Sequence, residues 1–157
     1  MLKNNMSKKN EYLQGVYEVQ NKEKYCCHKK PVYRSSYEKR LFYYLDHNET
    51  VLEWCSECVV IPYFYSVDQK VHKYYVDAYA KIETNTGIKK FLIEVKPLKQ
   101  TQPPLKPKNR SKKRTDRYLY EQQTYVRNID KWKAASDFCK KKGFEFKIVT
   151  EKDLWNN

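Results

Sequence analysis

Glycine is scarce in this sequence, with 3 residues among 157. Tyrosine is abundant, with 15 residues, and aromatic side chains make up 15% of the chain. Both features favour a compact fold with strands and few flexible loops. The 40% of apolar residues is typical of a globular protein rather than a disordered one. The length suits one domain with a single core.

Long apolar runs are also missing. No stretch reaches the roughly 18 residues that are needed to span a bilayer. The first twelve residues, MLKNNMSKKNEY, contain no apolar segment of the kind found in a secretory signal. We therefore expect a protein of the cytoplasm with no membrane partner.

Acidic residues are in the minority. The chain has 19 Asp and Glu against 32 Lys and Arg, for a formal net charge of +13. An excess of this size makes a domain repel itself unless a polyanion is nearby. Nucleic acid is the first candidate for that polyanion, and an anionic membrane surface is the second.

The five cysteines offer no complete metal-binding pattern. Cys55 and Cys58 form a CxxC, and the stretch Cys26-Cys27-His28 lies upstream, so a zinc site is conceivable. There is no second CxxC, however, and the segment around Cys55 is typical of a strand, in which residues three apart point to opposite faces. Because cytosol keeps thiols reduced, buried and reduced cysteines are the better interpretation.

Three regions are expected along the chain. Residues 1–30 are polar, basic and weakly patterned, which predicts a loosely packed basic arm with one short strand at 15–19. Residues 31–150 make up the single domain. Residues 151–157 are expected to form a polar tail.

The domain opens with a helix. Ser35 and Glu38 stand three residues apart and fit a capping box, in which a hydroxyl and a carboxylate satisfy free N–H groups at a helix start. The helix is expected to end near 46–48. The apolar face predicted from helical spacing consists of Tyr37, Leu41, Tyr44 and Leu45.

Three strands are expected after this helix. Residues 51–65 are rich in Val, Ile, Tyr and Trp and predict one strand with an irregular exit at Pro62. A second strand covers 71–82, and the hairpin signal Asn85-Thr86-Gly87 joins it to a third at 88–96. The second strand is expected to carry Val76, Ala78 and Ala80 on one face and Tyr75, Asp77 and Tyr79 on the other.

A break in composition follows at 97–117. This segment holds four prolines, no aromatic residue, and eight basic residues against one acid, which predicts an extended, solvated, cationic loop. A long amphipathic helix is predicted over 118–142, stopped by Gly143, with a last strand over 144–149. The order helix, three strands, helix, strand predicts an α/β or α+β fold whose mixed sheet is flanked by helices.

The third strand carries the residues that suggest chemistry. Glu94 and Lys96 share one face because side chains alternate along a strand. Pairing outward from the hairpin brings Asp77 to the same end of the sheet. Two adjacent carboxylates repel each other, and a hard cation such as Mg²⁺ between them relieves the repulsion, binds a phosphate oxygen and lowers the pKa of water. The pattern therefore predicts a site that cleaves phosphodiesters, with Lys96 supplying a further positive charge.

Simpler interpretations exist for each of these residues. Glu38 could serve only as the capping partner of Ser35, Asp77 could be a solvated strand residue, and Glu94 with Lys96 could be a surface ion pair of little energetic weight. The basic loop could be a solubilising linker. We favour contact with DNA, because the loop directly follows Lys96, and its lack of aromatic residues indicates sequence-independent binding of the phosphate backbone. The expected DNA-binding residues are Lys106, Lys108, Arg110, Lys112, Lys113, Arg114 and, on the long helix, Lys131.

The set also resembles the PD-(D/E)xK nuclease superfamily, whose core is a helix, a three-stranded meander, a second helix and a strand. On that resemblance Glu38 matches the acid of the first helix, Asp77 the Asp, Glu94 the D/E and Lys96 the Lys. The residue before Asp77 is Val76 where the motif has Pro, a departure that is common in the superfamily. All four residues are then catalytic, with Asp77, Glu94 and Glu38 as metal ligands for Mg²⁺, for which Mn²⁺ is expected to substitute.

Longer stretches resemble two groups of nucleases within that superfamily. The runs YRSSYEKRLFYYLD, HKYYVDAYA, IEVKPLKQTQPP and NIDKWKAASDFCKKKGFEF look like the head completion nucleases of T4-like tailed phages. They look more distantly like the endonuclease subunit of Tn7-type transposases. The resemblance covers roughly residues 30–150.

The phage resemblance implies a nuclease without a small-molecule cofactor that processes double-stranded DNA in filled heads before tails are joined. Its implied partners are the phage head and the portal or neck proteins, in the host cytoplasm during assembly or on the virion. A structural head protein that binds DNA without required catalysis remains an alternative. A transposase, restriction or repair endonuclease is another.

Overall fold

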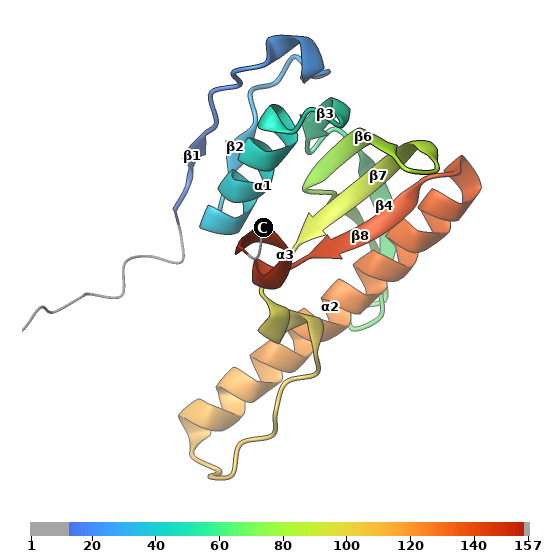
Figure 1. Cartoon of the computed structure of the whole chain (residues 1–157). Coiled ribbons are helices and arrows are strands. Elements are labelled where there is room, and N and C mark those ends of the chain that lie inside the picture. The colour runs from blue at the N-terminus through green and yellow to red at the C-terminus, as the bar shows by residue number, and fades with distance from the viewer. Residues whose placement is uncertain (1–12, 156–157) are drawn as a thin grey trace, which may run out of the picture.

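The computed structural model describes residues 13–155, and Figure 1 shows its arrangement. Residues 1–12 of the expected basic arm and residues 156–157 of the expected tail lie outside the described part. The helices are α1 (Ser36–His47), α2 (Lys112–Lys142) and α3 (Glu151–Trp155), with 3-10 turns η1 (Lys22–Lys24) and η2 (Leu98–Thr101). The strands are β1 (Gly15–Val16), β2 (Val32–Tyr33), β3 (Val51–Ser56), β4 (Val60–Tyr65), β5 (Lys70–Tyr75), β6 (Ala78–Thr84), β7 (Gly87–Val95) and β8 (Glu145–Val149).

The central sheet has four strands in the order β3-β6-β7-β8. The first three are antiparallel, and β8 runs parallel to β7 after the crossover through α2. The turn between β6 and β7 pairs Thr84 with Gly87, whose φ of 113° suits glycine. The fold is therefore α+β with a mixed sheet flanked by helices, and the predicted meander, crossover helix and last strand are confirmed.

The two faces of the sheet support separate cores. Phe91, Ile93 and Val95 of β7 pack with Leu41 and Leu45 of α1. The intervening Leu92 faces the other way and packs with α2 and with the β4–β5 ribbon. Because Glu94 and Lys96 continue the alternation of Leu92, they belong to the α2 side of the sheet.

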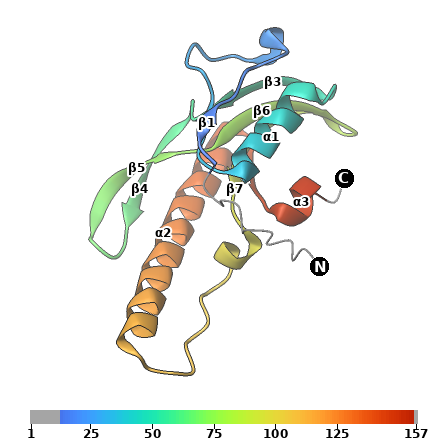
Figure 2. The same cartoon turned by 90° about the vertical axis from the view of Figure 1, so that its left-hand side faces the viewer.

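The β4–β5 ribbon is a feature that the sequence reasoning did not resolve. The single strands expected at 51–65 and 71–82 are each interrupted. The second part of the first, β4, pairs with the first part of the second, β5, as a separate two-stranded sheet (Figure 2). Glu57 takes a φ of 50° at the first interruption. Pro62 does not break a strand, because it lies in this exposed ribbon opposite Lys73.

The second interruption changes the expected faces of 71–82. Ala78 and Ala80 lie in the α1 core, as their shared face predicts. Val76, which was expected to join them, packs instead in the α2 core together with Tyr79. The alternation restarts at Asp77, which lies between β5 and β6 rather than inside a strand.

Several expected boundaries also differ. In α1, Phe42 is buried and Tyr44 is 43% exposed, so the buried face is rotated relative to the predicted one. Helix α2 begins at Lys112, six residues before its expected start, so the basic segment is only partly a loop. Gly143 does end the helix, with a φ of 70°.

The two ends of the described chain pack more closely than expected. Tyr17 is buried in the α1 core and donates a hydrogen bond to Asp46 at 3.0 Å, and the backbone N–H groups of Gln20 and Asn21 donate to the same carboxylate. Leu154 of α3 joins the same core. Tyr17 and Leu154 are therefore packed more tightly than a loose arm and a polar tail would predict, while most other side chains of residues 13–30 and 151–155 are exposed or half-buried, and the expected short strand is present as β1. Within 13–155, no helix combines the length and apolar character that crossing a membrane requires.

Candidate active site

Asp77 and Glu94 meet at one end of the sheet. The β6–β7 ladder pairs Ala78 with Ile93, so the next residue on each strand, Asp77 and Glu94, stand opposite each other just beyond it. The backbone N–H of Val95 donates to Oδ2 of Asp77 at 2.8 Å. The Nζ of Lys96 lies 3.0 Å from Oε1 of Glu94. The sequence prediction that these three side chains converge describes their arrangement correctly.

Burial makes this a strongly interacting group. Glu94 is 2% exposed, and burial together with its charge raises the pKa of Asp77 well above the ordinary value. Burial alone would lower the pKa of Lys96, but the charges of Glu94, Asp77 and Glu38 outweigh it and raise that pKa. Lys96 is therefore a protonated cation at neutral pH, facing an excess of negative charge.

Glu38 reaches the same region from the N-terminus of α1. Ser35 caps the helix, since its Oγ accepts a hydrogen bond from the Glu38 N–H at 3.1 Å. The Glu38 carboxylate accepts from the backbone N–H of Arg34 at 2.8 Å, one residue earlier than in a standard capping box. Burial raises the pKa of Glu38 despite these hydrogen bonds, and Lys96 is close enough to lower it. Glu38 is thus both a capping residue and a neighbour of the site.

A cleft lies beside this group. It has a volume of about 460 Å³ and runs between the start of α1 and the chain that leaves β7. Glu38 and Lys96 line it, whereas Asp77 and Glu94 do not, and Arg34 and Lys99 add positive charge at its walls. A chain of negative phosphates is suited to such an opening.

The basic segment forms a protrusion beside the site. The four buried residues of α2 all lie between Asn128 and Cys139, and the first half of the helix extends beyond the sheet together with the preceding loop (Figure 1). We call residues 102–117 the basic protrusion. Its exposed cations include the expected Lys106, Lys108, Arg110, Lys112, Lys113 and Arg114.

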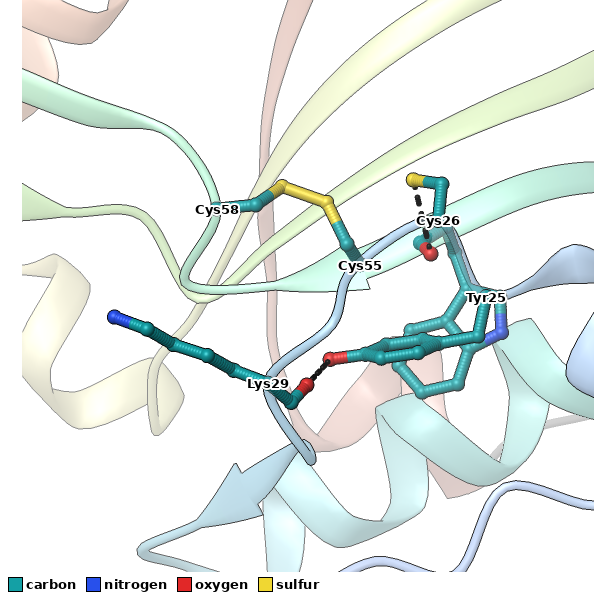
Figure 3. Close-up of a disulfide and its surroundings, with 6 residues drawn as sticks. Tyr25, Cys26, Lys29, Cys55 and Cys58 are labelled. Carbon is teal, nitrogen blue, oxygen red and sulfur yellow. Dashed lines mark hydrogen bonds between the residues drawn. A yellow bond between two sulfur atoms is a disulfide. The ribbon is translucent and has the colours of Figure 1, made fainter.

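The CxxC forms a disulfide, which the sequence analysis did not expect. Cys55 and Cys58 are joined, with 6.1 Å between their Cα atoms, and Figure 3 shows the bond near Cys26. The strand argument failed because β3 ends at Ser56 and Glu57 turns the chain back. Within residues 13–155, no three His, Cys, Asp or Glu side chains gather closely enough to hold a metal ion, which applies both to the cysteines and to the expected ligand set Glu38, Asp77 and Glu94.

The disulfide loop also contacts the site. The backbone N–H of Glu57 donates to the carbonyl oxygen of Asp77 at 3.3 Å. The Glu57 carboxylate pairs with the guanidinium of Arg34, whose own N–H holds Glu38. One short loop thus braces both Asp77 and Glu38.

Comparison with known proteins identifies the family of this chain. Residues 48–151 match the family described as TnsA-like endonuclease N terminal. The chain belongs to this family. It is also 41% identical over 126 residues to the "Head completion nuclease" of Enterobacteria phage T4, an alignment that covers 80% of this chain and 82% of that protein. Both resemblances drawn from the sequence are confirmed.

Membership of an endonuclease family implies a divalent metal ion, and the site residues fit one. Asp77 and Glu94 supply only oxygen ligands, which hard cations prefer. No hydrogen bond from the described residues reaches Oδ1 of Asp77, and the pKa of this carboxyl is raised first by burial and then by the charge of Glu94, which a cation would neutralise. Two carboxylates are enough for a small divalent ion that keeps several waters.

Two residues near the site gain importance from the structure. Tyr74 is 1% exposed and donates a hydrogen bond to Oε2 of Glu94 at 2.6 Å. Lys131 was expected to bind DNA, but its closeness to Glu94 and Asp77 was not anticipated. The sequence offered one clue to Tyr74, its position three residues before Asp77. On an uninterrupted strand, residues three apart point to opposite faces, so this clue was misleading.

Proposed function

We propose that this chain is a Mg²⁺-dependent endonuclease of the PD-(D/E)xK type that acts on double-stranded DNA during phage head completion. The observation that supports it most directly is the buried Glu94 opposite the partly exposed Asp77, with Nζ of Lys96 at 3.0 Å from Glu94. The name of the T4 relative supports head completion as the setting. The work of the enzyme is then to process packaged DNA before heads and tails are joined, in the host cytoplasm or on the virion, in contact with head, portal or neck proteins.

Asp77 and Glu94 would hold the metal, with Mn²⁺ able to replace Mg²⁺. When bound, the ion supplies Lewis-acid polarisation of a phosphate oxygen and lowers the pKa of water. Glu38 lines the same cleft as Lys96 and would hold the water that attacks phosphorus or act as a further ligand.

Lys96 would act as a cation and not as a base. Its raised pKa keeps the ammonium protonated at neutral pH, so it donates hydrogen bonds to the attacking water and to the phosphate as negative charge develops. Cleavage of the bond between phosphorus and the 3′ oxygen leaves a 5′-phosphate and a 3′-hydroxyl. This hydrolysis requires no small-molecule cofactor.

The basic protrusion would grip the phosphate backbone on one side of the cut. Its basic side chains are exposed, and Asp116 is the one acidic residue of the segment. Each contact between a basic side chain and a phosphate therefore adds to affinity without reading base sequence. We assign this role to Lys106, Lys108, Arg110, Lys112, Lys113 and Arg114.

The test is cleavage of linear and circular plasmid DNA by the wild type and by Lys96→Ala, each with Mg²⁺ and with EDTA. We expect the wild type to cut both DNAs only with Mg²⁺, and Lys96→Ala to bind DNA but not cut. Lys141→Ala, which removes an exposed lysine from the last turn of α2, serves as the matched control and keeps its activity. Salt-sensitive binding by the wild type without any cleavage would instead favour a structural head protein.

A further inference from the structure

Lys131 lies on α2 at the point where this helix passes the candidate site. Its side chain is half-buried and forms no ion pair with a carboxylate among residues 13–155. Its Nζ lies instead 5.3 Å from the ring centroid of Tyr74 and 5.8 Å from that of Tyr63. Two aromatic rings thus hold an ammonium that has no anionic partner of its own.

The same tyrosine connects Lys131 to the metal-binding pair. The hydroxyl of Tyr74 donates to Glu94 while its ring contacts the ammonium of Lys131. Burial lowers the pKa of Lys131, and together with the charge of Lys96 it outweighs the charges of Glu94 and Asp77, which act to raise that pKa. The molecule therefore places a second ammonium beside the two carboxylates, on the α2 side.

Three of the four oxygens of the neighbouring carboxylates already have partners, and Oδ1 of Asp77 is the exception among the described residues. Oε1 of Glu94 contacts Lys96, Oε2 accepts from Tyr74, and Oδ2 of Asp77 accepts from Val95. Cation–π contacts are worth about 0.5–2 kcal/mol, which is less than the several kcal/mol that desolvating an ammonium can cost. An anion supplied from outside the chain would offset the remainder.

A second donor lies on the same face of the helix. Asn128 precedes Lys131 by three residues, which places the two side chains next to each other. Asn128 is 5% exposed, and its Nδ2 has no hydrogen-bond partner in the described part of the chain. Lys131 without an ion-pair partner and Asn128 with an unsatisfied Nδ2 are therefore neighbouring donors on this helix.

We propose that Lys131 binds a phosphate oxygen of the DNA strand in the active site, as a second cation opposite Lys96. This inference rests on the proposed nuclease function and deepens it. Tyr63 and Tyr74 are positioning residues, because their rings fix where the ammonium lies. A phosphate held between Lys96 and Lys131 gains charge in the transition state, so Lys131 contributes to turnover and not only to affinity.

The experiment compares Lys131→Met with Lys133→Met in single-turnover cleavage at saturating DNA and Mg²⁺. Lys133 lies two residues later on α2 and is exposed, so it controls for the loss of one charge from this helix. We expect Lys131→Met to lower the rate on the order of 100-fold, while Lys133→Met stays within about threefold of the wild type. Lys131→Arg should recover part of the loss because it keeps the charge.

A second measurement uses the wild type and does not depend on how the variants fold. Lysine acylation read out by mass spectrometry, in EDTA with and without a short duplex, should show Lys131 modified in the free protein and protected by DNA. Equal rates for Lys131→Met and Lys133→Met, or no protection of Lys131, would overturn the inference while leaving the nuclease function intact. A wild type that binds DNA but never cleaves it would overturn both.

Discussion

The phenol of Tyr74 donates a hydrogen bond of 2.6 Å to Oε2 of Glu94, and this contact joins the β4–β5 ribbon to the end of the central sheet. Glu94 is nearly inaccessible to solvent, so this oxygen depends on Tyr74 for a donor. Burial and the charge of Glu94 raise the pKa of the phenol, which therefore remains a neutral donor over the working range of pH.

Tyr74→Phe removes that donor and keeps the ring that contacts Lys131. We expect the Mg²⁺ concentration for half-maximal cleavage to rise about 10- to 100-fold, because residues that orient metal ligands typically have effects of this size. Loss of a partner for a buried charge should also lower the unfolding free energy by about 1–3 kcal/mol. A Mg²⁺ titration of the cleavage rate and a urea unfolding curve measure the two effects. An unchanged Mg²⁺ requirement would show that Tyr74 serves packing alone.

Asp77→Asn should stabilise the metal-free protein at neutral pH. The pKa of Asp77 is raised in the fold, so the folded state favours its protonated form, and the stability associated with it falls as pH rises through that pKa. Asparagine does not ionise, so the variant avoids this loss of stability. The difference in unfolding free energy between Asp77→Asn and the wild type should therefore grow from acidic to neutral pH. Thermal unfolding in EDTA measures it.

Thermal unfolding of the same two proteins with added Mg²⁺ tests where the ion binds. Addition of Mg²⁺ should raise the unfolding temperature of the wild type, because the ion binds only the folded state. The Asp77→Asn variant should respond little and should not cleave DNA. An equal response of both proteins to Mg²⁺ would place the ion elsewhere.

The sequence could predict those parts of the site whose positions are determined by residues close to them in the chain. Asp77, Glu94 and Lys96 were found because a tight hairpin and the two-residue period of strands fix which side chains meet. Tyr74 and Lys131 could not be placed, because their positions depend on the ribbon turning out of the sheet and on the lateral docking of α2.

The errors share a tertiary origin. The positive φ of Glu57 redirects the chain, splits an expected strand and brings Cys58 back to Cys55. Leu154 looked like part of a polar tail, since a single apolar residue gives no periodic signal, yet it fills the α1 core. The early start of α2 was missed because lysine and arginine are compatible with both helix and solvated loop.

The basic protrusion should control affinity more than turnover. Replacing Lys112, Lys113 and Arg114 together by Gln should reduce the slope of log binding constant against log salt by about 0.9 per lost phosphate contact. The rate at saturating DNA should change little. Lys140, Lys141 and Lys142 provide a matched control triple at the other end of the same helix. Equal salt slopes for the two triple variants would argue against a DNA-binding role for the protrusion.

The Cys55–Cys58 disulfide should contribute to stability even though its loop is short. Closing so small a loop restricts the unfolded chain by about 2 kcal/mol in the chain-entropy estimate. Reductant, or the double substitution Cys55→Ser with Cys58→Ser, should lower the unfolding free energy by that amount. Cys26→Ser, at an exposed thiol, should leave it unchanged. A stability that is insensitive to reductant would mean that the two thiols stay unpaired in solution.

The length of α2 has a geometric consequence for the DNA. The helix is continuous over 31 residues, and the 19 residue steps from Lys112 to Lys131 span about 28 Å, which is about eight base pairs of duplex. On the proposed function, one rigid rod carries the outermost backbone contact at one end and the phosphate at the cut near its middle. The region of DNA protected by the protein should therefore be asymmetric, extending a fixed distance to one side of the cut. Cleavage then requires a stretch of free duplex of that length beside every bond that the enzyme breaks.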